Sequence, residues 1–345
     1  MTLRPSRPLA ALALALVPLL LAGCQAQKKA GTPAAGAGPV VGLVFDIGGR
    51  GDKSFNDAAA AGLDSAKKDL GIPEPEVMEP GEGGDRESAL RELAAKNTDI
   101  VFGVGFLFSD DIKAVAKEFP DKKFACIDMN VAEGETLPPN LVALKFKEEE
   151  GSYLVGALTG LLTKTKTVGF LGGMEIPLIK KFEAGYRAGV EKTAPGAKVL
   201  VKYAGATGQA FKDPTKGKEL GLAMYGEGAD IVFHASGSTG LGLFEAAKEK
   251  NALAIGVDSD QYDSMPGHVL TSMVKRVDVA VYPTIRDLKN GSFPGGQVKI
   301  YGLAQDGVGY VYDSRNANLI PAPVKAKVDA LRDDIIAGRI RVPSQ

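Results

Sequence analysis

The stretch VVGLVFDIGGRGDKSFNDAAAAGLDSAKKDL, residues 40–70, decides the fold. It begins with an apolar run, 40–45, which predicts a buried strand that ends at Asp46. A glycine-rich turn follows, and small and apolar residues then recur at helical spacing. In open α/β sheets, ligands bind at the carboxyl ends of strands, beside the starts of the following helices. We therefore expect Asp46, Phe55 and Asn56 to face a small polar ligand.

The same alternation of strand, turn and helix continues along the chain. Apolar runs predict strands at 40–45, 99–105, 123–127, 141–146, 167–171, 198–203, 231–234, 253–257 and 269–274. Helical spacing and capping residues predict helices at 86–96, 109–119, 151–162, 178–192, 241–250, 277–289 and 324–337, and one that starts at Asp213-Pro214. Glycine-punctuated β structure is expected over 295–312. This order predicts α/β architecture with parallel sheets covered by helices.

The alternation restarts after residue 162, which indicates two lobes of similar size. We expect an N-terminal lobe over 40–146, completed by about 272–294. A C-terminal lobe is expected over 147–271, completed by about 295–345. A tail that returns to both lobes implies a hinge and a ligand cleft that the strand ends of both lobes face. The charged run 147–150 is interpreted as a solvated segment near one crossing.

The N-terminal residues have the pattern of an export signal. Arg4 and Arg7 precede an apolar run, 9–21, which is too short to span a membrane comfortably. Residues 1–23 are therefore predicted to be a signal peptide.

Cys24 directly follows Leu-Ala-Gly, which resembles the bacterial lipobox. That resemblance implies that Cys24 is acylated, for example with palmitate, and anchors the mature chain in a lipid bilayer. Residues 24–39 would then be the lipidated cysteine and a flexible tether rich in Ala, Gly, Lys and Pro. We expect a protein anchored to the cell membrane on its extracytoplasmic side. The alternative is an ordinary cleaved signal with an incidental cysteine.

Composition excludes several classes of function. The net charge is −1, and loss of the two arginines of the signal peptide would make it −3, which gives no indication of nucleic-acid binding. The chain has only two histidines and two cysteines, so a zinc cluster or a Cys/His catalytic pair is not expected. No cofactor or metal is expected. Cys126 lies in an apolar run and is predicted to be a small buried side chain.

Polar and aromatic residues follow the predicted strands of both lobes. The candidate site residues are Asp46, Phe106, Asp128, Ser236, Gly237, Asp258 and Lys275 at strand ends, with Phe55, Asn56 and Phe211 from loops and helix starts. Carboxylates accept hydrogen bonds from paired hydroxyls or ring N–H groups, aromatic faces stack on flat rings, and a buried lysine would offset the carboxylate charge. Taken singly, each aspartate could be explained as a helix cap or turn residue, and each phenylalanine as part of the hydrophobic core. Only their joint occurrence indicates a binding site.

These residues resemble the basic membrane protein family, the PnrA-like purine-nucleoside-binding lipoproteins of ABC transporters. The resemblance rests on motifs in the same order along nearly the whole mature chain: Asp52-Lys53-Ser54-Phe55-Asn56, Gly103-Val104-Gly105-Phe106, Ile127-Asp128, Gly185-Tyr186-Arg187-Ala188-Gly189, Ser236-Gly237-Ser238-Thr239-Gly240, Ile255-Gly256-Val257-Asp258 and Thr271-Ser272-Met273-Val274-Lys275-Arg276. It implies a type I periplasmic-binding-protein fold, with two Rossmann-like lobes that close on a nucleoside.

The resemblance also implies roles for most of these residues. Phe55 and Phe211 match the two rings that sandwich the base, and Asp128 matches the aspartate that holds it. The residues that match ribose contacts are Asp46, Gly237, Asp258 and Lys275, with Asn56 close by. Ser236 stands where glycine is common in the family, which would add a polar group to the site.

The expected function is capture of a purine nucleoside (adenosine, guanosine or inosine) and its delivery to an ABC permease and ATPase. One alternative keeps the fold and binds a sugar or another small polar metabolite. Another is a ligand-sensing receptor or surface adhesin. A nucleoside hydrolase or phosphorylase is disfavoured, because neither the N-terminal aspartate cluster of a calcium-dependent hydrolase nor a nucleophile–base pair is visible.

Overall fold

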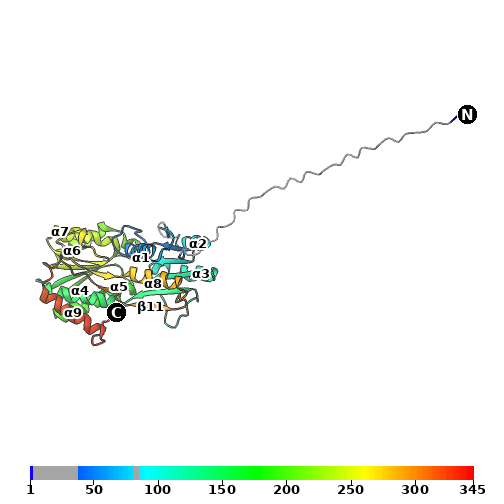
Figure 1. The fold of residues 1–345 in the computed structure, drawn as a ribbon. Coiled ribbons are helices and arrows are strands. Elements are labelled where there is room, and N and C mark those ends of the chain that lie inside the picture. Colours follow the sequence, from blue (N-terminus) through cyan, green and yellow to red (C-terminus); the bar gives the residue numbers. More distant parts are fainter. Residues whose placement is uncertain (3–37, 81–84) are drawn as a thin grey trace. The chain divides into compact units, whose positions relative to one another are not determined.

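The chain folds into two six-stranded sheets flanked by helices (Figure 1). The computed structural model describes residues 1–2, 38–80 and 85–345. Residues 3–23 of the predicted signal peptide, Cys24 and nearly all of the predicted tether lie outside the described residues. Within residues 38–80 and 85–345, no helix is both long enough and apolar enough to cross a membrane.

In the part of the chain that the structure describes, twelve strands form the sheets. They are β1 (Val41–Val44), β2 (Glu76–Met78), β3 (Ile100–Val104), β4 (Lys123–Ile127), β5 (Leu141–Phe146), β6 (Thr167–Met174), β7 (Lys198–Gly205), β8 (Ile231–Ala235), β9 (Leu253–Asp258), β10 (Val269–Lys275), β11 (Val298–Tyr301) and β12 (Val308–Tyr310). The helices are α1 (Phe55–Leu70), α2 (Arg86–Ala95), α3 (Ser109–Glu118), α4 (Glu148–Leu162), α5 (Pro177–Thr193), α6 (Pro214–Gly226), α7 (Gly240–Glu249), α8 (Val277–Lys289) and α9 (Ala322–Ile336). Short 3-10 helices are η1 (Phe106–Phe108), η2 (Gly208–Phe211), η3 (Gly237–Thr239), η4 (Tyr262–Ser264) and η5 (Leu303–Gln305).

The two sheets have the same strand order. The first runs β11-β5-β4-β3-β1-β2 and is parallel throughout. The second runs β12-β10-β9-β8-β6-β7, and only β12 is antiparallel to its neighbour. The predicted α/β fold, two doubly wound halves of similar size, is therefore confirmed. We call the first sheet with its helices the N-terminal lobe and the second with its helices the C-terminal lobe.

The central strands are largely apolar because both of their faces are buried. In β3, Phe102 points to the core that includes α1 and α8, whereas Val101 points to the core that includes α2 and α3. The second sheet repeats this arrangement: Phe233 packs toward α5, and Val232 packs toward α6 and α7. Helix α9 packs beside α4 (Figure 1). Cys126 is fully buried in β4, as predicted.

The chain crosses between the lobes three times, at Lys147, Arg276 and Gly302. Backbone hydrogen bonds hold these crossings together: Lys147 N–H donates to the Tyr301 carbonyl at 3.0 Å, and Arg276 N–H donates to the Gly307 carbonyl at 2.8 Å. The predicted hinge corresponds to these crossings.

Sheet membership differs from the expected segments at two places. Residues 272–275 were expected in the N-terminal lobe, but they end β10 of the second sheet. Strand β11 was expected in the C-terminal lobe, but it pairs with β5 of the first sheet. The chain crosses back to the first sheet only after β10, and it leaves again after one edge strand.

Candidate functional site

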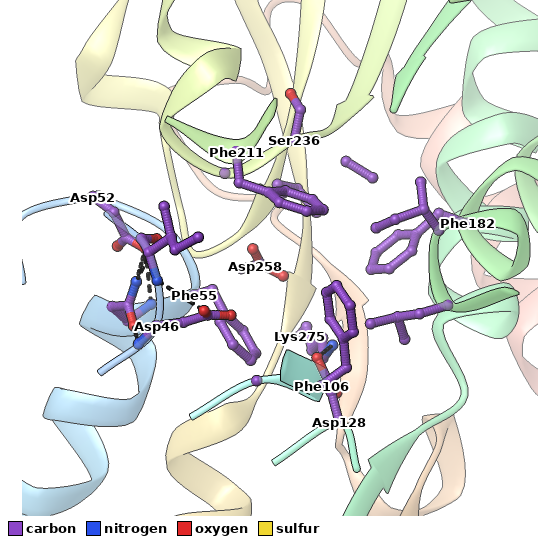
Figure 2. A pocket seen from close by; sticks show the side chains of 18 residues that line it. Asp46, Asp52, Phe55, Phe106, Asp128, Phe182, Phe211, Ser236, Asp258 and Lys275 are labelled. Carbon is purple, nitrogen blue, oxygen red and sulfur yellow. Dashed lines mark hydrogen bonds and ion pairs between the residues drawn. The ribbon is translucent and has the colours of Figure 1, made fainter. Parts of the chain in front are cut away.

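A cavity lies where the strand ends of the two lobes face each other (Figure 2). All the residues predicted from strand ends and helix starts line this cavity: Asp46, Phe55, Asn56, Phe106, Asp128, Phe211, Ser236, Gly237, Asp258 and Lys275. Its remaining lining residues are Ile47, Asp52, Gly105, Leu178, Ile179, Phe182, Ala235 and Val257.

Equivalent strand ends of the two sheets provide similar groups. Asp128 directly follows β4, and Asp258 is the last residue of β9, the corresponding strand. Both have left-handed backbones, with φ of +58° and +64°. Aspartate tolerates this conformation better than most residues, and strained backbone is typical of ligand sites. The two carboxylates therefore project into the cavity from opposite lobes.

The start of α1 fixes the position of Asp46. Asp52 accepts hydrogen bonds from three backbone N–H groups of the first helical turn, those of Ser54 (2.8 Å), Asn56 (2.9 Å) and Asp57 (3.1 Å). The Asn56 amide donates to Asp52 at 3.0 Å and accepts from the Asp46 backbone N–H at 2.8 Å. An acidic side chain at a helix N-terminus stabilises the helix, so this cluster is rigid. Asn56 thus orients Asp46 through bonds within the N-terminal lobe.

Lys275 is the centre of a buried charge cluster. Its ammonium is 2.5 Å from Asp128 Oδ2 and 3.1 Å from Glu148 Oε1, and its side chain is 2% exposed. Burial alone would lower the pKa of Lys275, but Asp128, Glu148 and Asp258 outweigh burial and raise it. Lys181 also contacts Glu148. Lys275 is therefore a permanent cation at the crossing between β10 and α8.

Two of the carboxylates retain hydrogen-bonding capacity toward the cavity. Asp128 Oδ1 is buried and has no hydrogen-bond partner among the described residues. Asp258 accepts a hydrogen bond from Ser54 Oγ–H at 2.6 Å. Burial raises the pKa of Asp258, and that of Asp46, to about 7. Burial also raises the pKa of Asp128, with Lys275 opposing that rise. The cavity therefore offers acceptors for O–H and N–H donors of a ligand.

Aromatic rings line the cavity from both lobes (Figure 2). Phe55 and Phe106 come from the N-terminal lobe, and Phe211 and Phe182 come from the C-terminal lobe. Phe106 and Phe211 lie edge to face, with ring centroids 6.4 Å apart. Gly173 leaves room for Phe211, because a Cβ there would lie 2.2 Å from its ring. Flat apolar faces with polar groups between them suit a planar heterocycle that carries hydroxyl groups.

The hydroxyl of Ser236 is directed away from the cavity centre in Figure 2. Its Oγ lies 3.2 Å from Nδ1 of the buried His234. The predicted extra polar group toward the ligand is therefore engaged inside the second sheet.

Sequence reasoning missed Phe182 and Glu148. Phe182 lies within α5, where its apolar spacing matched a core position; the signal that could have found it is that α5 follows β6 as α1 follows β1. Glu148 belongs to the charged run interpreted as solvated, but its side chain is only 1% exposed because Lys275 and Lys181 neutralise it. A buried lysine with several acidic partners was the available signal.

The chain is similar to known substrate-binding proteins. Residues 39–345 match the family model described as ABC transporter substrate-binding protein PnrA-like. A Lactococcus lactis protein named ABC transporter nucleoside-binding protein BmpA is 33% identical over 97% of both chains. An uncharacterised lipoprotein of Pyrococcus furiosus is 36% identical over 86% of this chain and 76% of its own length. The crystal structure of an ABC transporter solute-binding protein from Aeropyrum pernix has a TM-score of 0.78 at 30% identity, covering 89% of this chain and 94% of that chain.

Proposed function

Because the chain belongs to the PnrA-like family of ABC transporter substrate-binding proteins, we propose that its cavity binds purine nucleosides. The observation that supports this ligand most strongly is the pairing of aromatic faces with carboxylates from both lobes in one cavity. The Lactococcus relative, whose name states nucleoside binding, points in the same direction.

The base would occupy the aromatic part of the cavity. Phe55 and Phe211 would stack on its two faces, since base–aromatic stacking is worth about 1–3 kcal/mol per base. The unpartnered Asp128 Oδ1 would accept a hydrogen bond from an N–H group of the base. A purine presents more stacking surface than a pyrimidine, which favours adenosine, guanosine or inosine.

The ribose would lie near Asp46, Gly237, Asp258 and Lys275. The carboxylates would accept hydrogen bonds from the ribose hydroxyls, and the Lys275 ammonium would donate to a ligand oxygen. Ser54 already occupies one oxygen of Asp258 and fixes its orientation.

The charge balance favours nucleosides over nucleotides. Among the described residues that line the cavity, Asp46, Asp52, Asp128 and Asp258 carry carboxyl groups, and Lys275 is the single cation. A phosphate group brought into this cavity would meet like charges that are poorly screened by water.

We further propose where the protein acts. The signal peptide and the acylated Cys24 would anchor it on the extracytoplasmic side of the cell membrane, and the name of the Pyrococcus relative supports a lipoprotein. The two lobes would close on the ligand, and an ABC permease with its ATPase would receive it.

Binding would proceed without chemical change of the nucleoside. This part of the proposal is tested by incubating the protein with inosine and analysing the mixture by liquid chromatography. Recovery of intact inosine is expected, whereas release of hypoxanthine would contradict it.

A thermal-shift panel tests the ligand class. Refolded protein should melt at a higher temperature with adenosine, guanosine or inosine, because a ligand that binds only the folded state stabilises it. Ribose, glucose and free adenine should give much smaller shifts at equal concentration. Stabilisation by a free sugar and not by nucleosides would refute the proposal in favour of a sugar-binding protein.

A further inference from the structure

The loop that follows β9 makes direct contacts with the opposite lobe. Ser259 Oγ–H donates to the Ser54 carbonyl at 2.9 Å, and the Gln261 side-chain amide donates to the Lys53 carbonyl at 3.0 Å. Lys53 has a left-handed backbone, with φ of +54°, just before the start of α1. These bonds exist only while the two lobes are close together.

Two backbone groups fix the orientation of the Gln261 amide independently. The Val257 N–H donates to Gln261 Oε1 at 2.8 Å, so this oxygen faces β9. The nitrogen therefore faces the Lys53 carbonyl, which can only accept. The Gln261 backbone N–H donates to Ser272 Oγ at 3.0 Å, and the residue is 1% exposed. Bonds within the C-terminal lobe therefore hold Gln261 in the orientation in which its amide contacts the N-terminal lobe.

His234 extends this arrangement to the cavity wall. Its Nε2 lies 3.1 Å from Gln261 Oε1 and must carry the proton, because that oxygen can only accept. Its Nδ1 then accepts from Ser236 Oγ–H at 3.2 Å. Burial lowers the pKa of His234 to about 4, which keeps the ring neutral. A continuous path of hydrogen bonds therefore runs from Ser236, which lines the cavity, through His234 and Gln261 to the Lys53 carbonyl.

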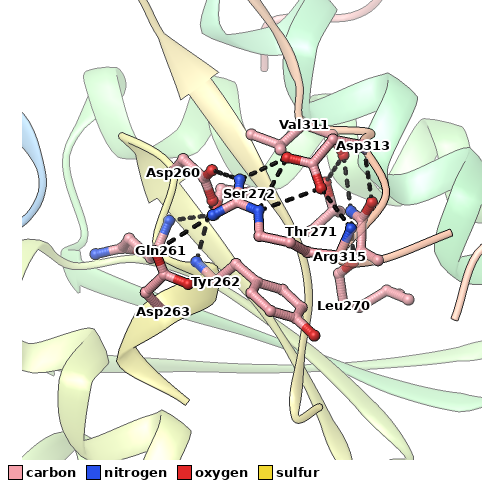
Figure 3. A network of polar contacts seen from close by, with 11 residues as sticks. Asp260, Gln261, Tyr262, Asp263, Leu270, Thr271, Ser272, Val311, Asp313 and Arg315 are labelled. Atoms are coloured by element: carbon pink, nitrogen blue, oxygen red, sulfur yellow. Dashed lines mark hydrogen bonds and ion pairs between the residues drawn. The ribbon is translucent and has the colours of Figure 1, made fainter. Parts of the chain in front are cut away.

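Ion pairs within the C-terminal lobe also brace this loop (Figure 3). Arg315 contacts Asp260 and lies 3.3 Å from Asp263, the two acidic residues that flank Gln261. Asp313 lies 2.5 Å from the same guanidinium. Each of these exposed ion pairs is weak by itself, but together they limit the movement of the loop.

We propose that Gln261 is a positioning residue that holds the closed state of the two lobes and thereby slows release of the ligand. It lies outside the cavity lining and would act through the Lys53 carbonyl and the start of α1, which bears Phe55 and Asn56. This inference rests on the proposed binding function for its ligand, but the closed geometry that it requires is independent of the ligand's identity.

The test replaces Gln261 by glutamate. Gln261→Glu keeps an acceptor for Val257 and His234 but places a second acceptor opposite the Lys53 carbonyl. Loss of one interlobe hydrogen bond should accelerate adenosine dissociation about tenfold in stopped-flow measurements, with the association rate nearly unchanged. Gln261→Met, which adds no charge, should have the same direction of effect. Gln297→Glu, the same substitution at an exposed residue of the N-terminal lobe, is the matched control.

A second measurement does not depend on the ligand assignment. Spin labels, one on each lobe, report the closed fraction by electron–electron resonance with and without adenosine. We expect both Gln261 variants to have a smaller closed fraction than the wild type. Equal closed fractions and equal dissociation rates would overturn the role of Gln261. If the wild type neither binds nor closes with nucleosides, the proposed ligand fails, and the ligand-free distance distributions still decide the role of Gln261.

Discussion

At the scale of single residues, the cavity is defined by carboxylates that the protein keeps out of water. Asp258 is 8% exposed and Asp128 is 7% exposed, and each is held by one specific partner, Ser54 or Lys275. Such groups are costly to bury without partners. Their remaining lone pairs are therefore available to ligand donors at a site where water competes poorly.

Asp258→Asn should weaken nucleoside binding about tenfold to a hundredfold, since a hydrogen bond to a charged group contributes about 1.5–3 kcal/mol. The amide oxygen can still accept from Ser54, so the fold should be retained. Calorimetry on the refolded variant measures the change, with Asp121→Asn, at an exposed position, as the control. Unchanged affinity would remove Asp258 from the binding site.

The raised pKa of Asp258 and Asp46 also predicts how stability depends on pH. Both carboxyls ionise near pH 3.8 when unfolded but near 7 when folded, so the folded chain binds more protons between these values. The free energy of unfolding of the ligand-free protein should therefore fall as pH rises toward 7 and level off above it. The slope is at most about 1.4 kcal/mol per pH unit for each carboxyl.

His234 has the opposite effect between about pH 4 and its ordinary pKa of 6.5, but one imidazole offsets only one of the two carboxyls, so the fall in stability should be measurable between about pH 5 and 7. Urea unfolding at several pH values measures it, and Asp258→Asn should have a shallower slope than the wild type. Stability that rises with pH over this interval would contradict the account.

At the scale of elements, the site depends on how strands end and helices begin. The sequence predicted these positions because a strand buried on both faces is a continuous apolar run that stops at the first polar or glycine residue. The apolar spacing of α5 did not single out Phe182, because that spacing alone does not distinguish a ring that lines the cavity from one that packs on the core. Strand β2 was missed because a three-residue strand between prolines has no alternation to detect.

The end of β6 offers an element-scale test. Gly173→Ala would place a methyl group against the Phe211 ring and displace the 3-10 helix that bears it. Affinity for purine nucleosides should fall at least tenfold, because stacking of one base contributes about 1–3 kcal/mol. Gly226→Ala, where a Cβ meets nothing within 4 Å, is the control. Equal affinities in titration calorimetry would show that Phe211 is not a stacking surface.

At the scale of the whole molecule, two copies of one topology face each other across the cavity. The periodic sequence was sufficient to predict two lobes, but not that β11 returns to the first sheet, because an edge strand of four residues contains no signal for its partner. The burial of Glu148 depends on Lys275 and Lys181, which are distant in sequence, so the composition of the charged run 147–150 alone does not reveal it. Contacts between distant segments are what the structure adds.

The central claim is that this cavity binds purine nucleosides as intact molecules. The most direct test is calorimetric titration of the chain from residue 25, unfolded and refolded to remove any bound ligand. We predict one site per chain with tight binding of adenosine, guanosine or inosine, and much weaker binding of cytidine, uridine, ribose and adenine. Absence of heat with every nucleoside, or binding of ribose as tight as that of a nucleoside, would contradict the claim.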